Sequence, residues 1–124
     1  KNTRPEIAVR SKLHKAGYRF RLHVEGLPGK PDIVLKKYKT IIFVNGCFWH
    51  RHKGCKRASI PSTRVDFWQA KFESNIARDQ KNLSRLKEAK WKVCLVWECE
   101  IDKISRRTEK LLELANEIVQ PLDI

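Results

Sequence analysis

The sequence predicts an α/β fold in which a mixed β-sheet is flanked by helices. Hydrophobic periodicities along the chain follow the order α-β-β-β-α-β-α. A long helical segment precedes the last strand, as in a crossover between parallel strands, whereas the earlier strands are close enough to form hairpins. With 124 residues, 41% hydrophobic and 33% charged, we expect one domain over residues 1–124 with an ordinary core.

The first element predicted is a helix over residues 3–16. Thr3, Pro5 and Glu6 fit a capping box with proline in the first turn, and Gly17 supplies the stop signal. Residues 18–24 alternate between apolar and polar side chains, which is the period of a half-buried strand.

Two short β-branched runs come next, at residues 32–35 and 40–44. Proline and glycine make residues 27–31 a turn, and the basic residues 36–39 connect the two runs as a hairpin. The end of the second run is therefore expected beside the start of the first.

The second half begins with a long helix, capped by Ser62 or Thr63 and ending near Lys90. Apolar residues at intervals of three, four or seven predict one inward-facing stripe: Val65, Trp68, Phe72, Ile76, Leu83 and Leu86. A strand over 91–97 and a helix over 105–119, closed by Pro121, complete the chain. The tryptophans on these elements are expected in the core, namely Trp68, Trp91 and Trp97, and Cys94 is expected to be a small buried hydrophobe.

The charge of the chain indicates a polyanionic partner. Lysine and arginine total 27 against 14 aspartate and glutamate, for a net charge of +13. Such a surface binds phosphate backbones by releasing counterions. A basic protein that is merely soluble has the same composition, so charge alone does not decide the function. No apolar run approaches the roughly 20 residues of a membrane span, and we expect no membrane association.

Three cysteines and a histidine have the spacing of a zinc site. Cys47, His52 and Cys55 follow the pattern C-x4-H-x2-C, and Cys99 supplies a further thiol. Two disulfides are the alternative, but the clustered histidines and a reducing cytoplasm favour a metal. Either His50 or His52 can complete the four ligands. His52 has the more usual spacing to Cys55, which leaves His50 as a candidate base.

Asp32 and Val44 form a candidate Mg²⁺ site. In the predicted hairpin the Asp32 carboxylate and the Val44 carbonyl are neighbours, and both are hard oxygen ligands. The alternative is that Asp32 only caps the turn before it. Glu6 either completes the capping box or helps to arrange the water shell of the metal.

Phe48 and Trp49 are adjacent aromatic residues among the zinc ligands. We expect neighbouring side chains in a loop to diverge, which makes burial of both in one core awkward. If exposed, they can act as wedges that unstack and bend duplex DNA. Core packing is the alternative for each aromatic.

These motifs together resemble the very short patch repair (Vsr) DNA mismatch endonucleases, from the first helix through Cys99. The resemblance is carried by LPGKPDIV at 27–34, FVNGCFWHRH at 43–52, Ser62–Arg64 with Phe67 and Trp68, Asn75 with Arg78 and Asp79, and VWEC at 96–99. It implies a restriction-endonuclease-like fold, a structural zinc, and Mg²⁺-dependent nicking on the 5′ side of the thymine in T:G mismatches that arise from deamination of 5-methylcytosine.

The resemblance also implies a role for each site residue. Asp32 and the Val44 carbonyl would bind Mg²⁺, Glu6 would act through metal-bound water, and His50 would be the general base. Zinc would be bound by Cys47, His52, Cys55 and Cys99, and the intercalating residues would be Phe48 and Trp49. The implied partners are double-stranded DNA with a T:G mismatch and mismatch-repair proteins, for a monomer in a bacterial cytoplasm, associated with the nucleoid.

The sequence departs from the family at two places. Asn45 stands where members usually have a histidine of the catalytic cluster, and asparagine does not titrate near neutrality. The N-terminal extension that reaches DNA in relatives is missing or truncated. Two alternative functions therefore stay open: a zinc-stabilised module that binds distorted DNA with impaired or no cleavage, and a sequence-specific homing or restriction-type nuclease.

Overall fold

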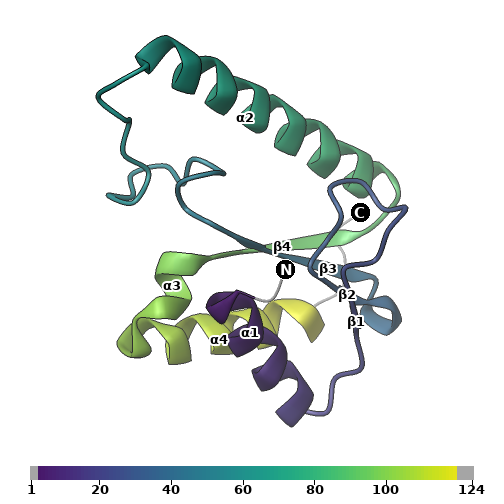
Figure 1. Cartoon of the computed structure of the whole chain (residues 1–124). Helices are drawn as coiled ribbons and strands as arrows, with labels where there is room; N and C mark the ends of the chain where they lie inside the picture. The colour runs from purple at the N-terminus through teal and green to yellow at the C-terminus, as the bar shows by residue number, and fades with distance from the viewer. Residues whose placement is uncertain (1–2, 120–124) are drawn as a thin grey trace.

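The computed structural model describes residues 3–119, apart from the side chains of residues 104, 105 and 108. The predicted order of elements is confirmed, with a 3-10 helix and one short helix added (Figure 1). The elements are α1 (Arg4–Lys15), β1 (Arg21–Leu22), β2 (Ile33–Leu35), η1 (Lys36–Tyr38), β3 (Thr40–Asn45), α2 (Val65–Glu88), β4 (Lys92–Trp97), α3 (Glu98–Asp102) and α4 (Ile104–Val119).

The predicted mixed sheet is confirmed. Its strand order is β1-β2-β3-β4, with β1, β2 and β3 antiparallel and β3 and β4 parallel. The parallel pair is joined by α2, so both strands end at the same edge of the sheet. The residues that follow Asn45 and Trp97 therefore start side by side.

Helices cover both faces of this sheet (Figure 1). Alternation along β3 sends Ile42 into a core with α1, α3 and α4, and sends Ile41 into a smaller cluster with Leu86 of α2. Cys94 belongs to the larger core and is 2% exposed, as predicted. None of the described helices is long and apolar enough to cross a bilayer.

The strand predicted over residues 18–24 is reduced to two residues. β1 contains only Arg21 and Leu22, both exposed, because it lies at the edge of the sheet and pairs with only two residues of β2. His23 has a left-handed backbone (φ 48°), which ends the strand. The start and stop of α1 are as predicted: the Glu6 backbone N–H donates to Thr3 Oγ1 at 3.3 Å, and Gly17 follows the helix at φ 87°.

The predicted start and apolar stripe of α2 are partly wrong. Arg64, not Ser62 or Thr63, is the N-cap, with a left-handed backbone and its guanidinium 4.3 Å from the Phe67 ring. Phe72 and Leu86 are buried, but Val65 and Ile76 are 41% and 39% exposed. α2 packs tightly on the sheet near its C-terminal end, at Leu86. In the middle of the helix, a cavity separates α2 from β3 and β4.

The C-terminal region contains an additional turn of helix. α3 follows β4 directly, and the Trp97 backbone N–H donates to Glu100 Oε1 at 2.8 Å, which starts this helix. The predicted stop at Pro121 lies outside the described residues. Three tryptophans were expected to be buried in the core, but each is only half-buried: Trp68, Trp91 and Trp97.

Candidate active site and metal cluster

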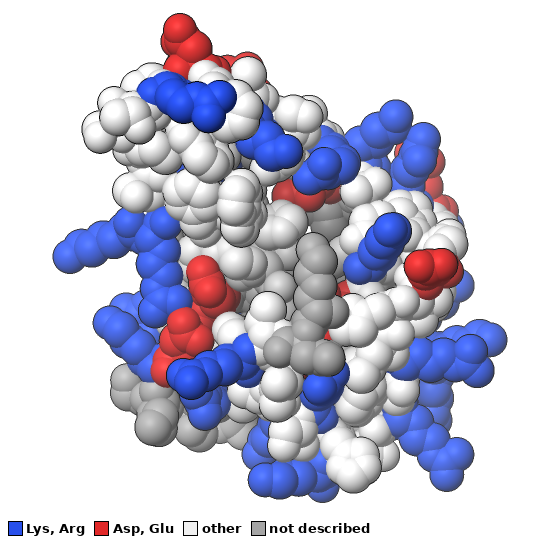
Figure 2. Space-filling model, in the orientation of Figure 1, with Lys and Arg blue, Asp and Glu red and all other residues white. Residues whose placement is uncertain are grey.

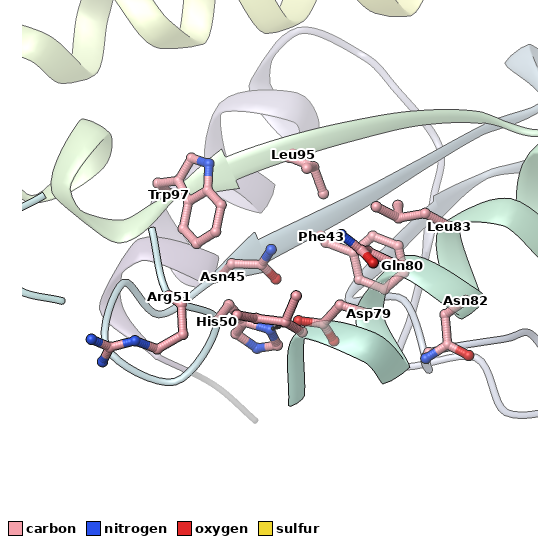
Figure 3. A pocket seen from close by; sticks show the side chains of 12 residues that line it. Phe43, Asn45, His50, Arg51, Asp79, Gln80, Asn82, Leu83, Leu95 and Trp97 are labelled. Carbon is pink, nitrogen blue, oxygen red and sulfur yellow. Dashed lines mark hydrogen bonds and ion pairs between the residues drawn. The ribbon is translucent and has the colours of Figure 1, made fainter. Parts of the chain in front are cut away.

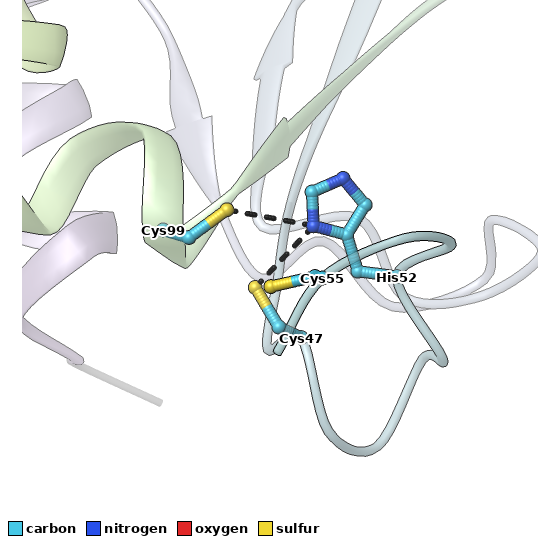
Figure 4. Close-up of side chains that lie close together, drawn as sticks. All are labelled: Cys47, His52, Cys55 and Cys99. Carbon is cyan, nitrogen blue, oxygen red and sulfur yellow. Dashed lines mark hydrogen bonds between the residues drawn. The ribbon is translucent and has the colours of Figure 1, made fainter. Parts of the chain in front are cut away.

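Cys47, His52, Cys55 and Cys99 converge beyond the ends of β3 and β4 (Figure 4). Their potential ligand atoms all lie within 4.8 Å of one another. His52 Nδ1 is 3.6 Å from Cys47 Sγ and 3.4 Å from Cys99 Sγ. Zn–S and Zn–N bonds of ordinary length at a tetrahedral angle place S and N about 3.6 Å apart. The cluster can therefore hold a zinc ion, and the disulfide alternative is wrong because all four cysteines of the chain are free.

The parallel strand pair positions this cluster. Cys47 follows β3 and Cys99 lies in α3, directly after β4, so two distant segments meet at one edge of the sheet. The Cys47 backbone N–H donates to Glu98 Oε1 at 3.0 Å. The His52 ring stacks on Trp97, with centroids 4.1 Å apart and planes inclined by 6°. These contacts hold the ligands in place from both strands.

The thiols differ in how readily they ionise without a cation. Burial raises the pKa of the Cys47 thiol to about 12, whereas the Arg57 backbone N–H lowers the pKa of Cys55. Binding of zinc as a thiolate complex therefore releases a proton from Cys47.

A second cluster is formed by Glu6, His23 and Asp32, whose potential ligand atoms also lie within 4.8 Å of one another. The Val44 backbone N–H donates to Asp32 Oδ2 at 2.7 Å. The predicted proximity of Asp32 and Val44 across the hairpin is therefore confirmed. Glu6 is 2% exposed, and its Oε2 lies 2.8 Å from His23 Nε2.

The electrostatics of this cluster favour a cation. Burial raises the pKa of both carboxyls, Glu6 and Asp32, above their ordinary values, and the charge of Asp32 raises that of Glu6 further. His23 acts in the opposite direction on both. A divalent cation at this position would neutralise two partly desolvated carboxylates at once.

His50 is separate from the thiol cluster and pairs with α2 instead (Figure 3). Its Nδ1 lies 2.6 Å from Asp79 Oδ2. A carboxylate on Nδ1 fixes the orientation of the ring and leaves Nε2 as the nitrogen that can accept a proton. Asn45, at the end of β3, lies with His50 and Asp79 in the lining of one cavity of about 250 Å³.

Sequence reasoning missed His23 and Asp79 as site residues. A signal for Asp79 exists in the sequence, because Asn75 and Asp79 are four residues apart and so share one face of α2. Asn75 is 6% exposed, and its Nδ2 donates to the Trp49 carbonyl at 3.3 Å. Two polar residues on the inward face of a helix mark a polar contact with the loop. His23 carried no such signal, because it occupied a polar position of a predicted strand.

Phe48 and Trp49 lie in one aromatic cluster with Trp68, Phe72 and Phe67. The expectation that the two side chains diverge is wrong: their ring centroids are 5.1 Å apart, because residues 47–51 form turns rather than an extended segment. Phe48 is half-buried, whereas Trp49 is 50% exposed. Two rings of the cluster thus face solvent, Trp49 and Phe67 (48% exposed), and Trp49 is the one next to His50 in the chain.

Arg51 ties this loop together. Its guanidinium lies 3.7 Å from the Phe72 ring centroid and donates to the carbonyls of Phe48 and Ser59. The arginine is therefore used inside the protein rather than offered to a ligand. Other lysine and arginine side chains project from the edges of the face shown in Figure 2, where acidic side chains form only small groups.

Comparison with known proteins places these features in a family context. A family model described as DNA mismatch endonuclease Vsr matches residues 1–57. The chain is 50% identical to the type II nicking enzyme V.XorIIP of Xanthomonas oryzae over 90% of its length and 81% of the relative. It is 44% identical to the type II nicking enzyme V.NmeAIP of Neisseria meningitidis, over 95% of this chain and 84% of the relative. It is 39% identical to the DNA mismatch endonuclease Vsr of Escherichia coli, over 90% of this chain and 71% of the relative.

Proposed function

We propose that this chain, which belongs to the Vsr family of DNA mismatch endonucleases, nicks one strand of double-stranded DNA on the 5′ side of the thymine in a T:G mismatch, with Mg²⁺ as cofactor. The family makes the chain an endonuclease that acts on DNA. The observation that carries the proposal is the arrangement at one sheet edge: a carboxylate cluster, a histidine paired with an aspartate, and an exposed tryptophan.

The residues around Asp32 fit a divalent cation. Glu6 Oε2 is buried and accepts no hydrogen bond from the described residues, although it makes ion-pair contacts with His23 and Arg10, so this oxygen can still accept a hydrogen bond from a metal-bound water. Asp32 and the Val44 carbonyl would bind Mg²⁺, and Glu6 would hold a metal-bound water. When bound, Mg²⁺ supplies Lewis-acid stabilisation of the scissile phosphate and of the leaving 3′ oxygen.

His50 acts as the general base in this proposal. With Asp79 on Nδ1, the Nε2 atom takes a proton from the water that attacks phosphorus. The P–O3′ bond breaks as the new P–O bond forms, and the leaving 3′ oxygen takes a proton from solvent, which leaves a 3′-hydroxyl and a 5′-phosphate. Asp79 stabilises the imidazolium produced by the transfer, so the base keeps its orientation through the step.

The thiol cluster has a structural role in this proposal. Cys47, His52, Cys55 and Cys99 would supply all four ligands of a zinc ion, which would leave no position for substrate. The ion would fasten the loop that carries His50 and Trp49 to the end of β4. Trp49, with Phe48 behind it, would insert into the base stack next to the mismatch.

A gel assay with strand-specific labels tests the proposal. The substrates are two duplexes of the same sequence, one with a T:G mismatch and one fully matched, each incubated with Mg²⁺ or with EDTA. We expect one Mg²⁺-dependent product, cut 5′ of the mismatched thymine. Equal cutting of the matched duplex would instead support a sequence-specific nuclease.

Asn45 favours a second candidate function, a module that binds distorted DNA without cutting it. Its amide lies in the same cavity wall as His50 and Asp79, where it can donate a hydrogen bond but cannot exchange a proton near neutrality. The variant Asn45→His separates the two functions. If the wild type binds the mismatch without cutting and Asn45→His cuts, the present chain is a binding module; if both cut, His50 is sufficient.

A further inference from the structure

We infer that His23 is a metal-binding residue of the cation site formed by Glu6 and Asp32, and that its imidazole makes this site bind Mn²⁺ more tightly than Mg²⁺. The inference rests on the proposed function and deepens it, because it adds a nitrogen ligand and a preference among cations to the same site. It concerns affinity, so nicking with Mg²⁺ at millimolar concentration is compatible with it.

The first argument is the geometry of the three side chains. A nitrogen of His23 lies within 4.8 Å of a carboxylate oxygen of Glu6 and of Asp32. Glu6 lies in α1, His23 directly follows β1 and Asp32 directly precedes β2, so the tertiary structure, and no local motif, brings them together. Separations of this size allow His23 and Asp32 to bind one ion directly, with Glu6 holding a water of that ion.

The second argument is the burial of Glu6 Oε2, whose contacts with His23 and Arg10 are ion pairs. The side chain is 2% exposed, and this oxygen accepts no hydrogen bond from the described residues. The ring nitrogen of His23 is close to it, at 2.8 Å, but the approach is an ion-pair contact rather than an aligned hydrogen bond. A cation bound beside the imidazole and the carboxylates would compensate the charge of this buried oxygen more completely.

The third argument is how the backbone delivers the ring. His23 has a left-handed conformation (φ 48°), which turns the chain sharply after β1. Its backbone N–H donates to the Asp32 carbonyl at 3.1 Å, so the main chains of two residues of the cluster are bonded to each other. This turn ends the alternation of β1 and places the imidazole beside Glu6.

The mixed donor set determines which cation is preferred. Mg²⁺ favours oxygen ligands and keeps most of its waters. Mn²⁺ shares the preference for carboxylate oxygens but, as a first-row transition-metal ion, gains more than Mg²⁺ does from one added nitrogen ligand. The thiol cluster does not interfere with this preference, because thiolates select zinc and bind Mn²⁺ poorly.

The test is to add Mn²⁺ to the zinc-loaded protein and to measure the bound Mn²⁺ by electron paramagnetic resonance. Bound Mn²⁺ in the wild type should show a ¹⁴N coupling from an imidazole, and His23→Gln should lose this coupling and bind Mn²⁺ on the order of tenfold more weakly. Mg²⁺ affinity, measured by competition, should change less. His14→Gln is the matched control, since His14 is an exposed histidine in the last turn of α1.

Three outcomes would overturn the inference. These are a wild-type Mn²⁺ complex without ¹⁴N coupling, a coupling that persists in His23→Gln, and an unchanged Mn²⁺ affinity in that variant. The first outcome needs no variant, so a folding defect in His23→Gln does not prevent the test. Nicking with Mg²⁺ in the wild type is measured separately, so the failure of this inference and the failure of the proposed function are distinguished.

Discussion

His50 Nδ1 and Asp79 Oδ2 are 2.6 Å apart, although 29 residues separate them in the chain. The contact joins the loop after β3 to the middle of α2. It gives the histidine a fixed orientation and a partner for the charge that it acquires as a base. The pair therefore leads to the first prediction.

Asp79→Asn should lower the rate of nicking by up to about 10⁴-fold, because an amide N–H facing Nδ1 favours the tautomer that is protonated on Nε2, and because the amide does not stabilise the imidazolium. His50→Ala should lower the rate by about 10²–10⁴-fold, which is the usual contribution of a general base. Single-turnover cleavage of a T:G duplex measures both rates. Asp66→Asn, an exposed acid in the first turn of α2, is the control. An unchanged rate in Asp79→Asn would show that the pair has no catalytic role.

Asp32→Ala should abolish nicking while mismatch binding is retained. The carboxylate is proposed to bind the catalytic cation, whereas DNA affinity arises from the basic surface and the aromatic residues. Fluorescence anisotropy with a labelled duplex measures binding, and a gel measures cleavage. Glu73→Ala, an exposed acid on α2, should affect neither. Nicking at the wild-type rate by Asp32→Ala would remove the metal assignment.

Trp49→Ala should reduce the preference for T:G over matched DNA by about 1–3 kcal/mol, the contribution of one aromatic ring stacked on a base. The folded state should lose little stability, because half of this side chain is already exposed. Competition binding with the two duplexes gives the difference. Phe67→Ala removes an aromatic residue of similar exposure from the same cluster and is the control. Equal loss of preference in both variants would contradict a specific wedge at Trp49.

Removal of zinc should expose three thiols and leave one protected. With zinc bound, iodoacetamide at pH 8 should modify none of the four cysteines. After treatment with a chelator, Cys47, Cys55 and Cys99 should react, because their loop loses the ion that fastens it. Cys94, which is 2% exposed in the main core, should react only in denaturant. Intact-mass spectrometry counts the modifications, and a reactive Cys94 in the chelated protein would show that the core itself depends on zinc.

The stability of the zinc-bound protein should decrease at alkaline pH partly through Cys94. Burial raises the pKa of this thiol from about 9 to about 12. A raised pKa means that the contribution is fully present below pH 9 and is lost as the pH rises toward 12. Cys94→Ala should therefore show a shallower loss of melting temperature between pH 8 and pH 11. Identical slopes for the two proteins would place the alkaline transition elsewhere.

Several features of the fold and the site were predictable because they depend on short stretches of chain. The hairpin places Asp32 beside Val44, and its register follows from a turn of a few residues. The ligands Cys47, His52 and Cys55 lie within nine residues, so their spacing limits the ways in which they can converge.

Other features were not predictable from local patterns. The start of α2 at Val65 follows a left-handed Arg64 and has no side-chain cap, so the capping pattern at Ser62 and Thr63 did not locate it. The contact of Arg64 with Phe67, three residues on, is a side-chain pairing that helix propensities do not contain. The exposure of Ile76 follows from the cavity between α2 and the sheet, although its position in the stripe predicted burial.

The sequence by itself determined the mixed α/β architecture, the convergence of a zinc-type ligand set and the neighbouring positions of Asp32 and Val44. Hydrophobic period, turn chemistry and ligand spacing act over a few residues, and the amino acids encode them directly. Only the tertiary structure decided that His23 joins Glu6 and Asp32, and that Asp79 reaches His50. These contacts depend on the angle at which whole elements pack, which is a collective result of the core and the aromatic cluster.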